Sequence, residues 1–156
     1  MDRDEALRNH LIALLDGGQA HLRYDNVVAD WPRESRGVRP EGAAHSPWQV
    51  LEHLRICQWD ILDFSRNAEH EALDWPADYW PAEEEPPTPD AWEKSIESFC
   101  DDMARMKALV EDRKRDLYEP FPWGDGQTLL REAMLVADHN SYHLGELMAL
   151  KKRLVK

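Results

Sequence analysis

Two histidines near the C-terminal end of the chain have a spacing that suits metal binding. His139 and His143 are four residues apart, so on a helix their side chains stand one above the other on one face. Two imidazoles at this spacing can chelate one ion. Their stripe also carries Leu135, Val136 and Leu147, so we expect the pair to face the protein interior. The pair alone leaves two interpretations open, a metal site and two histidines at the edge of the core.

The same spacing occurs in the H-E-x-x-H motif of zinc metalloproteases. In that motif the glutamate next to the first histidine is the general base. Asn140 occupies the position here. The sequence therefore does not predict a protease of that type.

A third histidine, His53, lies in another stretch with helical periodicity. It shares a stripe with Val50, Leu54 and Cys57, so it also points inward. A histidine on an apolar stripe is usually a satisfied core residue, but here two helices offer inward histidines to the same core. Three neutral imidazoles leave coordination positions open, which is typical of a catalytic rather than a structural metal site. The ligand set suits zinc, nickel or iron(II) and does not choose among them.

Two further residues fall close to these histidines in the pattern. Glu146 lies three residues after His143 and shares its face, so we name it as the candidate catalytic residue. It could act as a fourth ligand, as an acceptor for an imidazole N–H, or as a general base. The alternative is a solvated carboxylate near the helix end. Cys57 could bind metal as a thiolate, but a cysteine on an apolar stripe is more often packing.

Other polar and aromatic residues receive plainer interpretations. Asp60 lies two turns after His53 and could orient a ligand, although an exposed carboxylate is the expected role. His45 and His70 are expected to be ordinary loop residues. Four aromatic residues of the connections could cover a pocket mouth but are expected mainly to anchor their loops: Trp75, Tyr79, Trp80 and Trp123.

Four stretches have the apolar periodicity of helices and would position these side chains. They cover about residues 4–30, 46–67, 90–110 and 128–153. Gly17 and Gly18 weaken the first stretch by roughly 1 kcal/mol each relative to alanine and permit a kink there. Ser46, with a glutamine three residues later, opens the second stretch as a capping box, and Asp90 with Glu93 opens the third in the same way.

The fold class follows from these stretches. No segment reads as a strand, and 156 residues of which 42% are hydrophobic can build one core. We therefore predict an all-α four-helix bundle, formed as a single domain over residues 1–156. Its connections are long, and residues 68–89 are acidic, proline-rich and aromatic. A loop of this length is usually functional or disordered.

Charge and composition exclude several classes of partner. The chain has 19 basic and 31 acidic residues and a formal net charge of −12, which argues against nucleic acid or an anionic membrane. No apolar run is long enough to cross a membrane, and the first residues lack the pattern of a signal peptide. Cys57 and Cys100 fall in expected helices without a Cys-x-x-Cys motif, so we expect reduced thiols in a cytoplasmic protein.

Two motifs of the chain resemble those of the DinB-like superfamily of bacterial metal-binding four-helix bundles. The resemblance rests on two motifs and extends, through the order of the helices, over nearly the whole chain. The motifs are Ser46-Pro47-Trp48 leading into Leu51-Glu52-His53-Leu54, and Asp138-His139 followed by His143-Leu144-Gly145. It implies a metal ion held between helices by His53, His139 and His143. Many relatives are expected to have glutamine where this chain has Glu146.

The resemblance also implies a function. Some relatives are thiol-dependent enzymes, among them transferases for bacillithiol and a mycothiol-dependent maleylpyruvate isomerase. We therefore expect a divalent-metal-dependent enzyme, an S-transferase or hydrolase, that uses a small-molecule substrate and a low-molecular-weight thiol. The ion would act as a Lewis acid on bound water or thiol. The alternatives are a non-catalytic metal-binding or stress-response bundle and an interaction module built on residues 68–89. A homodimer is expected because relatives often form one.

Overall fold

The computed structural model describes residues 2–155, and within this range it contains helices and no strand. The α-helices are α1 (Arg3–Asp16), α2 (Tyr24–Val28), α3 (Pro47–Phe64), α4 (Ala91–Glu111) and α5 (Leu129–Leu154). Two short 3-10 helices, η1 (Arg33–Ser35) and η2 (Ala77–Tyr79), lie in the long connections. The all-α prediction is confirmed.

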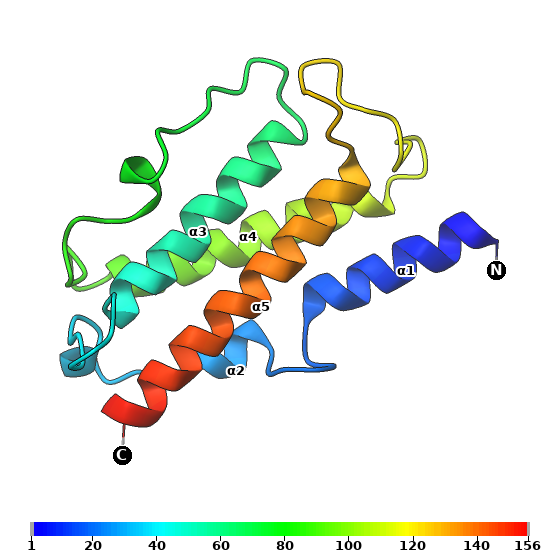
Figure 1. Ribbon diagram of the computed structural model, residues 1–156. Helices are drawn as coiled ribbons and strands as arrows, with labels where there is room; N and C mark the ends of the chain where they lie inside the picture. Colours follow the sequence, from blue (N-terminus) through cyan, green and yellow to red (C-terminus); the bar gives the residue numbers. More distant parts are fainter. Residues whose placement is uncertain (1, 156) are drawn as a thin grey trace.

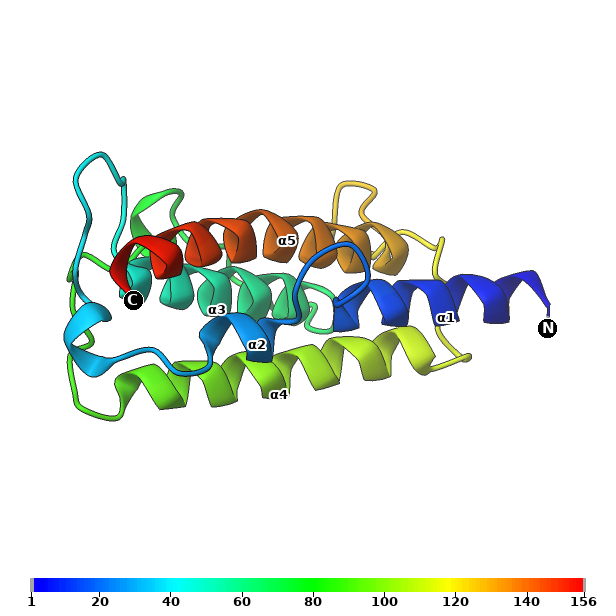
Figure 2. The ribbon, with the colours of Figure 1, turned by 90° about the horizontal axis from the view of Figure 1, so that it is seen from below.

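The helices form a bundle in which α3 is central. It packs against both α4 and α5, and α3 and α5 run side by side in opposite directions (Figure 1). α1 packs on α4 and α5, and α2 packs on α5, so the two together take the place of the fourth helix (Figure 2). Within the described residues, no helix combines the length and the apolar character needed to span a membrane.

The first helix differs from the expectation of one helix over residues 4–30. α1 ends at Asp16 because Gly17 and Gly18 adopt φ values of +66° and +78°. These left-handed conformations are open to glycine but cannot continue a right-handed helix. The chain becomes helical again only at Tyr24. The prediction of a single helix is therefore wrong, and the two glycines cause a break rather than a kink.

Local capping fixes where two helices begin and fails for a third. At α3 the capping box is confirmed, since Ser46 Oγ accepts from the N–H of Gln49 and Gln49 Oε1 accepts from the N–H of Ser46. Thr128 caps α5 by accepting from the N–H of residue 131. The predicted side-chain cap at Asp90 is wrong. Its carboxylate instead accepts from Lys94 and from Thr88, at 2.6 and 2.7 Å.

The core consists of two clusters of buried apolar side chains, placed one after the other along the bundle. The cluster near the C-terminal end of α5 includes Leu51, Leu54, Trp92, Phe99 and Leu147. The cluster near the N-terminal end of α5 includes Leu11, Leu62, Met106, Leu129 and Val136. These packed faces of α3 and α5 fix the seam along which the histidines lie.

Candidate metal centre

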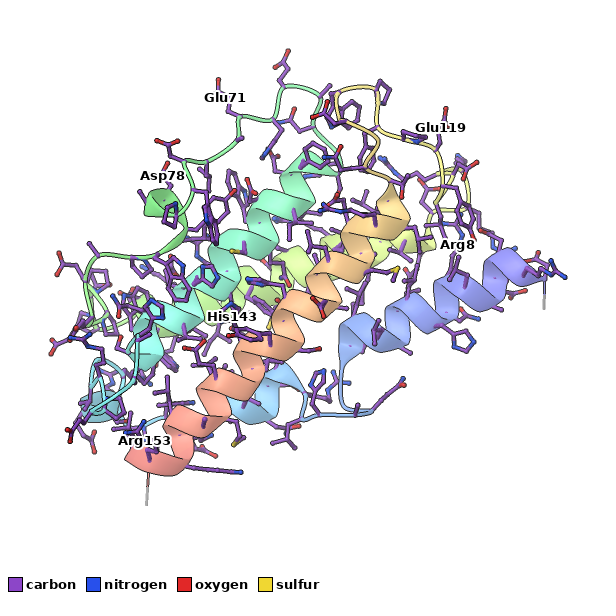
Figure 3. The ribbon with its side chains drawn as sticks, viewed as in Figure 1. Arg8, Glu71, Asp78, Glu119, His143 and Arg153 are labelled. Atoms are coloured by element: carbon purple, nitrogen blue, oxygen red, sulfur yellow. The ribbon has the colours of Figure 1, made fainter. Side chains whose placement is uncertain are left out.

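Three histidines converge on the seam between α3 and α5. His53 comes from α3 and His139 and His143 from α5, and one ring nitrogen of each lies within 4.8 Å of the others. Nε2 of His139 is 3.1 Å from Nε2 of His53. Two nitrogens that share one zinc ion at about 2.0–2.1 Å are roughly 3.4 Å apart in tetrahedral geometry. The cluster is thus compatible with the binding of one divalent ion. Figure 3 shows His143 on the length of α5 that lies beside α3.

Acceptors hold the second ring nitrogen of two of these histidines. Nδ1 of His53 donates to the carbonyl oxygen of Tyr79 at 2.8 Å. Nδ1 of His143 donates to Oε2 of Glu146 at 2.9 Å. Because carbonyl and carboxylate oxygens only accept, Nδ1 of each ring carries a proton, and Nε2 is the nitrogen that could bind a metal. Metal-binding histidines have this arrangement, in which the outer partner fixes the tautomer and the ring orientation.

The electrostatics of the cluster favour a cation. Burial lowers the pKa of His53 to about 4 and, with the neighbouring His143, lowers the pKa of His139 to about 4. Both rings are therefore neutral at pH 7, as metal ligands must be. The hydrogen bond from His143 lowers the pKa of Glu146, so a carboxylate anion stands beside the neutral rings.

Cys57 is part of the packing around His53. Its Sγ lies 3.5 Å from Nδ1 of that ring, and the residue is 6% exposed. Burial, with the carboxylate of Asp60 as a smaller cause, raises the pKa of the Cys57 thiol to about 12. The sulfur is therefore a protonated thiol at neutral pH, which supports packing rather than thiolate ligation.

Residues 68–89 fold over the histidines. The ring of Trp80 stacks on His53 with centroids 3.7 Å apart and an interplanar angle of 5°. It also stacks on His45, at 3.7 Å and 13°. His45 Nδ1 is in turn 3.9 Å from Oε1 of Glu146. The expectation that His45 is an ordinary loop residue is wrong, because its ring is part of the cover. Trp75, by contrast, is 69% exposed.

A second polar cluster, the Asp60–His70 cluster, holds the covering segment to α3. The hydroxyl of Tyr79 donates to Oδ2 of Asp60 at 2.7 Å. His70 places Nε2 3.3 Å from Oδ1 of Asp60 and Nδ1 3.0 Å from Oδ2 of Asp63. The side chains of Asp60 and His70 are only 15% and 8% exposed. Asp60 was expected to be an exposed carboxylate and His70 an ordinary loop residue. Both expectations are wrong, because the segment after α3 turns back over that helix and pairs the two side chains.

The structure thus brings the predicted ligands together, but the sequence did not predict all of the residues that surround them. The helical period placed His53, His139 and His143 on facing stripes. The partners His45 and Tyr79 lie in connections whose path no periodicity specifies. One signal was present, since the aromatic residues at 75, 79 and 80 predicted that this segment packs against the body.

Fold and site together define an all-α bundle with three inward histidines from two helices as a candidate metal centre. The chain belongs to the DinB superfamily, whose family model matches residues 6–147. The matched range contains the three histidines and Glu146, and it confirms the family resemblance seen in the sequence motifs. Comparisons with curated proteins and with solved structures found no match.

Proposed function

We propose that this chain is a divalent-metal-dependent enzyme of the DinB type, and that its 156 residues act as one domain. The ion, which we take to be zinc, nickel or iron(II), is held by His53, His139 and His143. The observation that carries the proposal is the convergence of three ring nitrogens within 4.8 Å. The outer partners of His53 and His143 support it, because they leave Nε2 of each ring available.

The chemistry that the ion supplies when bound is Lewis acidity towards water or a thiol. The residues of the chain orient and protect the site. The carbonyl of Tyr79 and the carboxylate of Glu146 orient two imidazoles, and the indole of Trp80 shields His53 from water. Glu146 uses Oε2 for His143, which leaves Oε1, 3.9 Å from Nδ1 of His45, as the oxygen that would accept a proton from a bound substrate. This makes Glu146 our candidate general base.

Elemental analysis of untagged protein tests the metal assignment. We expect close to one equivalent of a divalent transition metal in the wild type and little in His53→Ala or His139→Ala. Circular dichroism of the three proteins checks that the variants remain helical. A wild type without metal, or variants that keep it, would contradict the proposal.

Thiol-dependent S-transfer is the finer assignment, and it follows from the family rather than from the geometry. In the test reaction, the sulfur of a low-molecular-weight thiol displaces chloride from 1-chloro-2,4-dinitrobenzene, and chloride and a proton are released. We expect turnover by the wild type and none by His139→Ala. If several thiols and electrophiles give no turnover with metal-loaded wild type, the transferase assignment is wrong and the metal assignment stands.

The cover over the histidines favours one alternative, a non-catalytic bundle in which the ion serves stability. Trp80 stacks on His53 and His45 stacks on Trp80, and together they restrict access to His53. Cobalt-substituted protein separates the two functions. An open coordination position lets a small thiol change the visible spectrum of the cobalt, whereas a closed site leaves the spectrum unchanged. The homodimer and the cytoplasmic location stay predictions.

A further inference from the structure

The two residues of the capping box at α3 have hydrogen-bond donors that the cap does not use. The cap takes only acceptor atoms of their side chains, Oε1 of Gln49 and Oγ of Ser46. The side-chain amide of Gln49 donates instead to the carbonyl oxygen of Pro81, at 3.0 Å. The hydroxyl of Ser46 donates to the carbonyl oxygen of Glu84, at 2.6 Å. The start of α3 is therefore bound directly to the segment that covers the histidines.

These bonds continue, in antiparallel order, the one that orients His53. Gln49 lies four residues before His53, so the two side chains share a face of α3 and are about 6 Å apart along its axis. Trp80 has an extended conformation, which separates the carbonyl groups on its two sides by about 6–7 Å. The spacings match, and His53 binds the carbonyl of Tyr79 while Gln49 binds that of Pro81.

Trp80 is thus held to α3 on both sides of its own position in the chain. The covering segment, residues 68–89, runs back along α3 (Figure 1), and the indole of Trp80 lies on the ring of His53. Ser46 and Gln49 are 0% and 9% exposed, so their bonds to the covering segment are largely shielded from water. Release of these bonds would free the chain after Trp80 and uncover His53.

We propose that Ser46 and Gln49 are positioning residues of the candidate metal centre, which keep Trp80 on His53 and thereby limit the access of thiols to the ion. They act through the main chain of residues 80–84 and are not themselves ligands. The inference rests on the proposed function, because it takes the ion on His53 as the group that a thiol approaches.

Two substitutions remove the donors and keep the cap of α3. Gln49→Glu retains an acceptor oxygen, since glutamate serves in capping boxes as glutamine does, but its carboxylate has no N–H to donate to Pro81. Ser46→Gly removes the hydroxyl, and glycine is only slightly weaker than serine at this helix position. Two matched controls are Gln19→Glu, which adds the same charge at an exposed site, and Thr128→Gly, which makes the corresponding change at the cap of α5.

Digestion of the metal-free protein by a glutamate-specific protease measures the release of the covering segment. The carbonyl that is cleaved after Glu84 is the one that Ser46 binds, so cleavage there requires this bond to open. We expect it to be about 2–10-fold faster in Ser46→Gly and Gln49→Glu, because one hydrogen bond contributes about that factor to an equilibrium. Cleavage after the exposed Glu69 and Glu71 is the internal reference and should keep its wild-type rate.

Cobalt-substituted protein tests whether this release reaches the ion. We expect 2-mercaptoethanol to change the visible spectrum about 2–10-fold faster in both variants, since access follows the same opening, and at the wild-type rate in both controls. Lower stability alone would not change this rate in folded protein. The proposal is overturned if cleavage after Glu84 keeps its wild-type rate in both variants, or if cleavage becomes faster and the thiol reaction does not.

The two readouts also separate this inference from the proposed function. A wild type that binds no cobalt contradicts the proposed function, and the role in thiol access is overturned with it. Faster cleavage after Glu84 would in that case still show that Ser46 and Gln49 hold the covering segment.

Discussion

Two histidine clusters lie along α3 under the same covering segment, and they use their rings differently. In the candidate metal centre, His53 and His143 each donate Nδ1 to one acceptor, which leaves Nε2 of each ring as the nitrogen that could bind a metal. In the Asp60–His70 cluster, His70 has a carboxylate beside each nitrogen, at 3.3 and 3.0 Å. A ring with a carboxylate beside each nitrogen serves as a cross-link between the covering segment and α3.

The difference shows that the groups beside the ring nitrogens, rather than the number of histidines, decide which cluster suits a metal. Tyr79 joins the two clusters, because its carbonyl faces His53 and its hydroxyl faces Asp60. The Asp60–His70 cluster therefore holds Tyr79, whose carbonyl orients the proposed ligand His53. The comparison predicts that changes in the candidate metal centre alter metal binding strongly, whereas changes in the Asp60–His70 cluster alter mainly stability.

Removal of the metal should have the largest effect. A ligand that binds only the folded state at a thousand times its dissociation constant stabilises it by about 4 kcal/mol. For a chain of this size, that corresponds to roughly 8–16 °C in melting temperature. We expect chelation to lower the melting temperature of the wild type by this amount and to leave His139→Ala unchanged. Equal shifts in both proteins, measured by calorimetry, would show that the histidines do not hold the ion.

Alanine substitutions compare the two clusters directly. His139→Ala removes one of three proposed ligands and should weaken metal affinity by more than the roughly 100-fold that loss of an outer partner can cost. His70→Ala should leave the affinity within about twofold, since both of its nitrogens already have carboxylate partners. Competition with a chromophoric chelator measures both. A large loss of affinity in His70→Ala would erase the distinction between the clusters.

Two substitutions of Glu146 distinguish its role in orienting His143 from its proposed role as a general base. Glu146→Ala removes the acceptor of His143 Nδ1 and should weaken metal affinity about 10–100-fold. Glu146→Gln keeps an acceptor oxygen and should weaken it less. If Glu146 is also the general base, Glu146→Gln retains the metal and loses turnover in the thiol-transfer assay. Unchanged metal affinity in Glu146→Ala would show that Glu146 does not orient His143 for metal binding.

Tyr79→Phe should have the smallest effect and should act on stability. It removes the hydroxyl that donates to Asp60 and leaves a largely buried carboxylate oxygen without that donor, at a cost of about 1–2 kcal/mol. The main-chain carbonyl that faces His53 remains, so metal affinity should change less than about tenfold. Urea unfolding measures the stability. Tyr118→Phe, at a site 62% exposed, is the control and should stay within about 0.5 kcal/mol.

The features that the sequence predicted correctly depend on interactions between residues that are close in the chain. The all-α class came from apolar periodicity, and the start of α3 came from a capping box whose two hydrogen bonds join residues three apart. The inward direction of the three histidines followed from their stripes. The break after α1 was underestimated, because the propensity cost of two glycines does not reveal that both adopt positive φ.

The sequence by itself therefore determined the long helices α3, α4 and α5 and the faces on which His53, His139 and His143 stand, because both depend on residues within a few turns of each other. Only the tertiary structure decided which ring nitrogens stay available and which residues cover them. Those features join residues far apart in the chain, such as Tyr79 with His53 and His53 with His139. Such contacts depend on the path of the connections and on packing between helices, which no local period encodes.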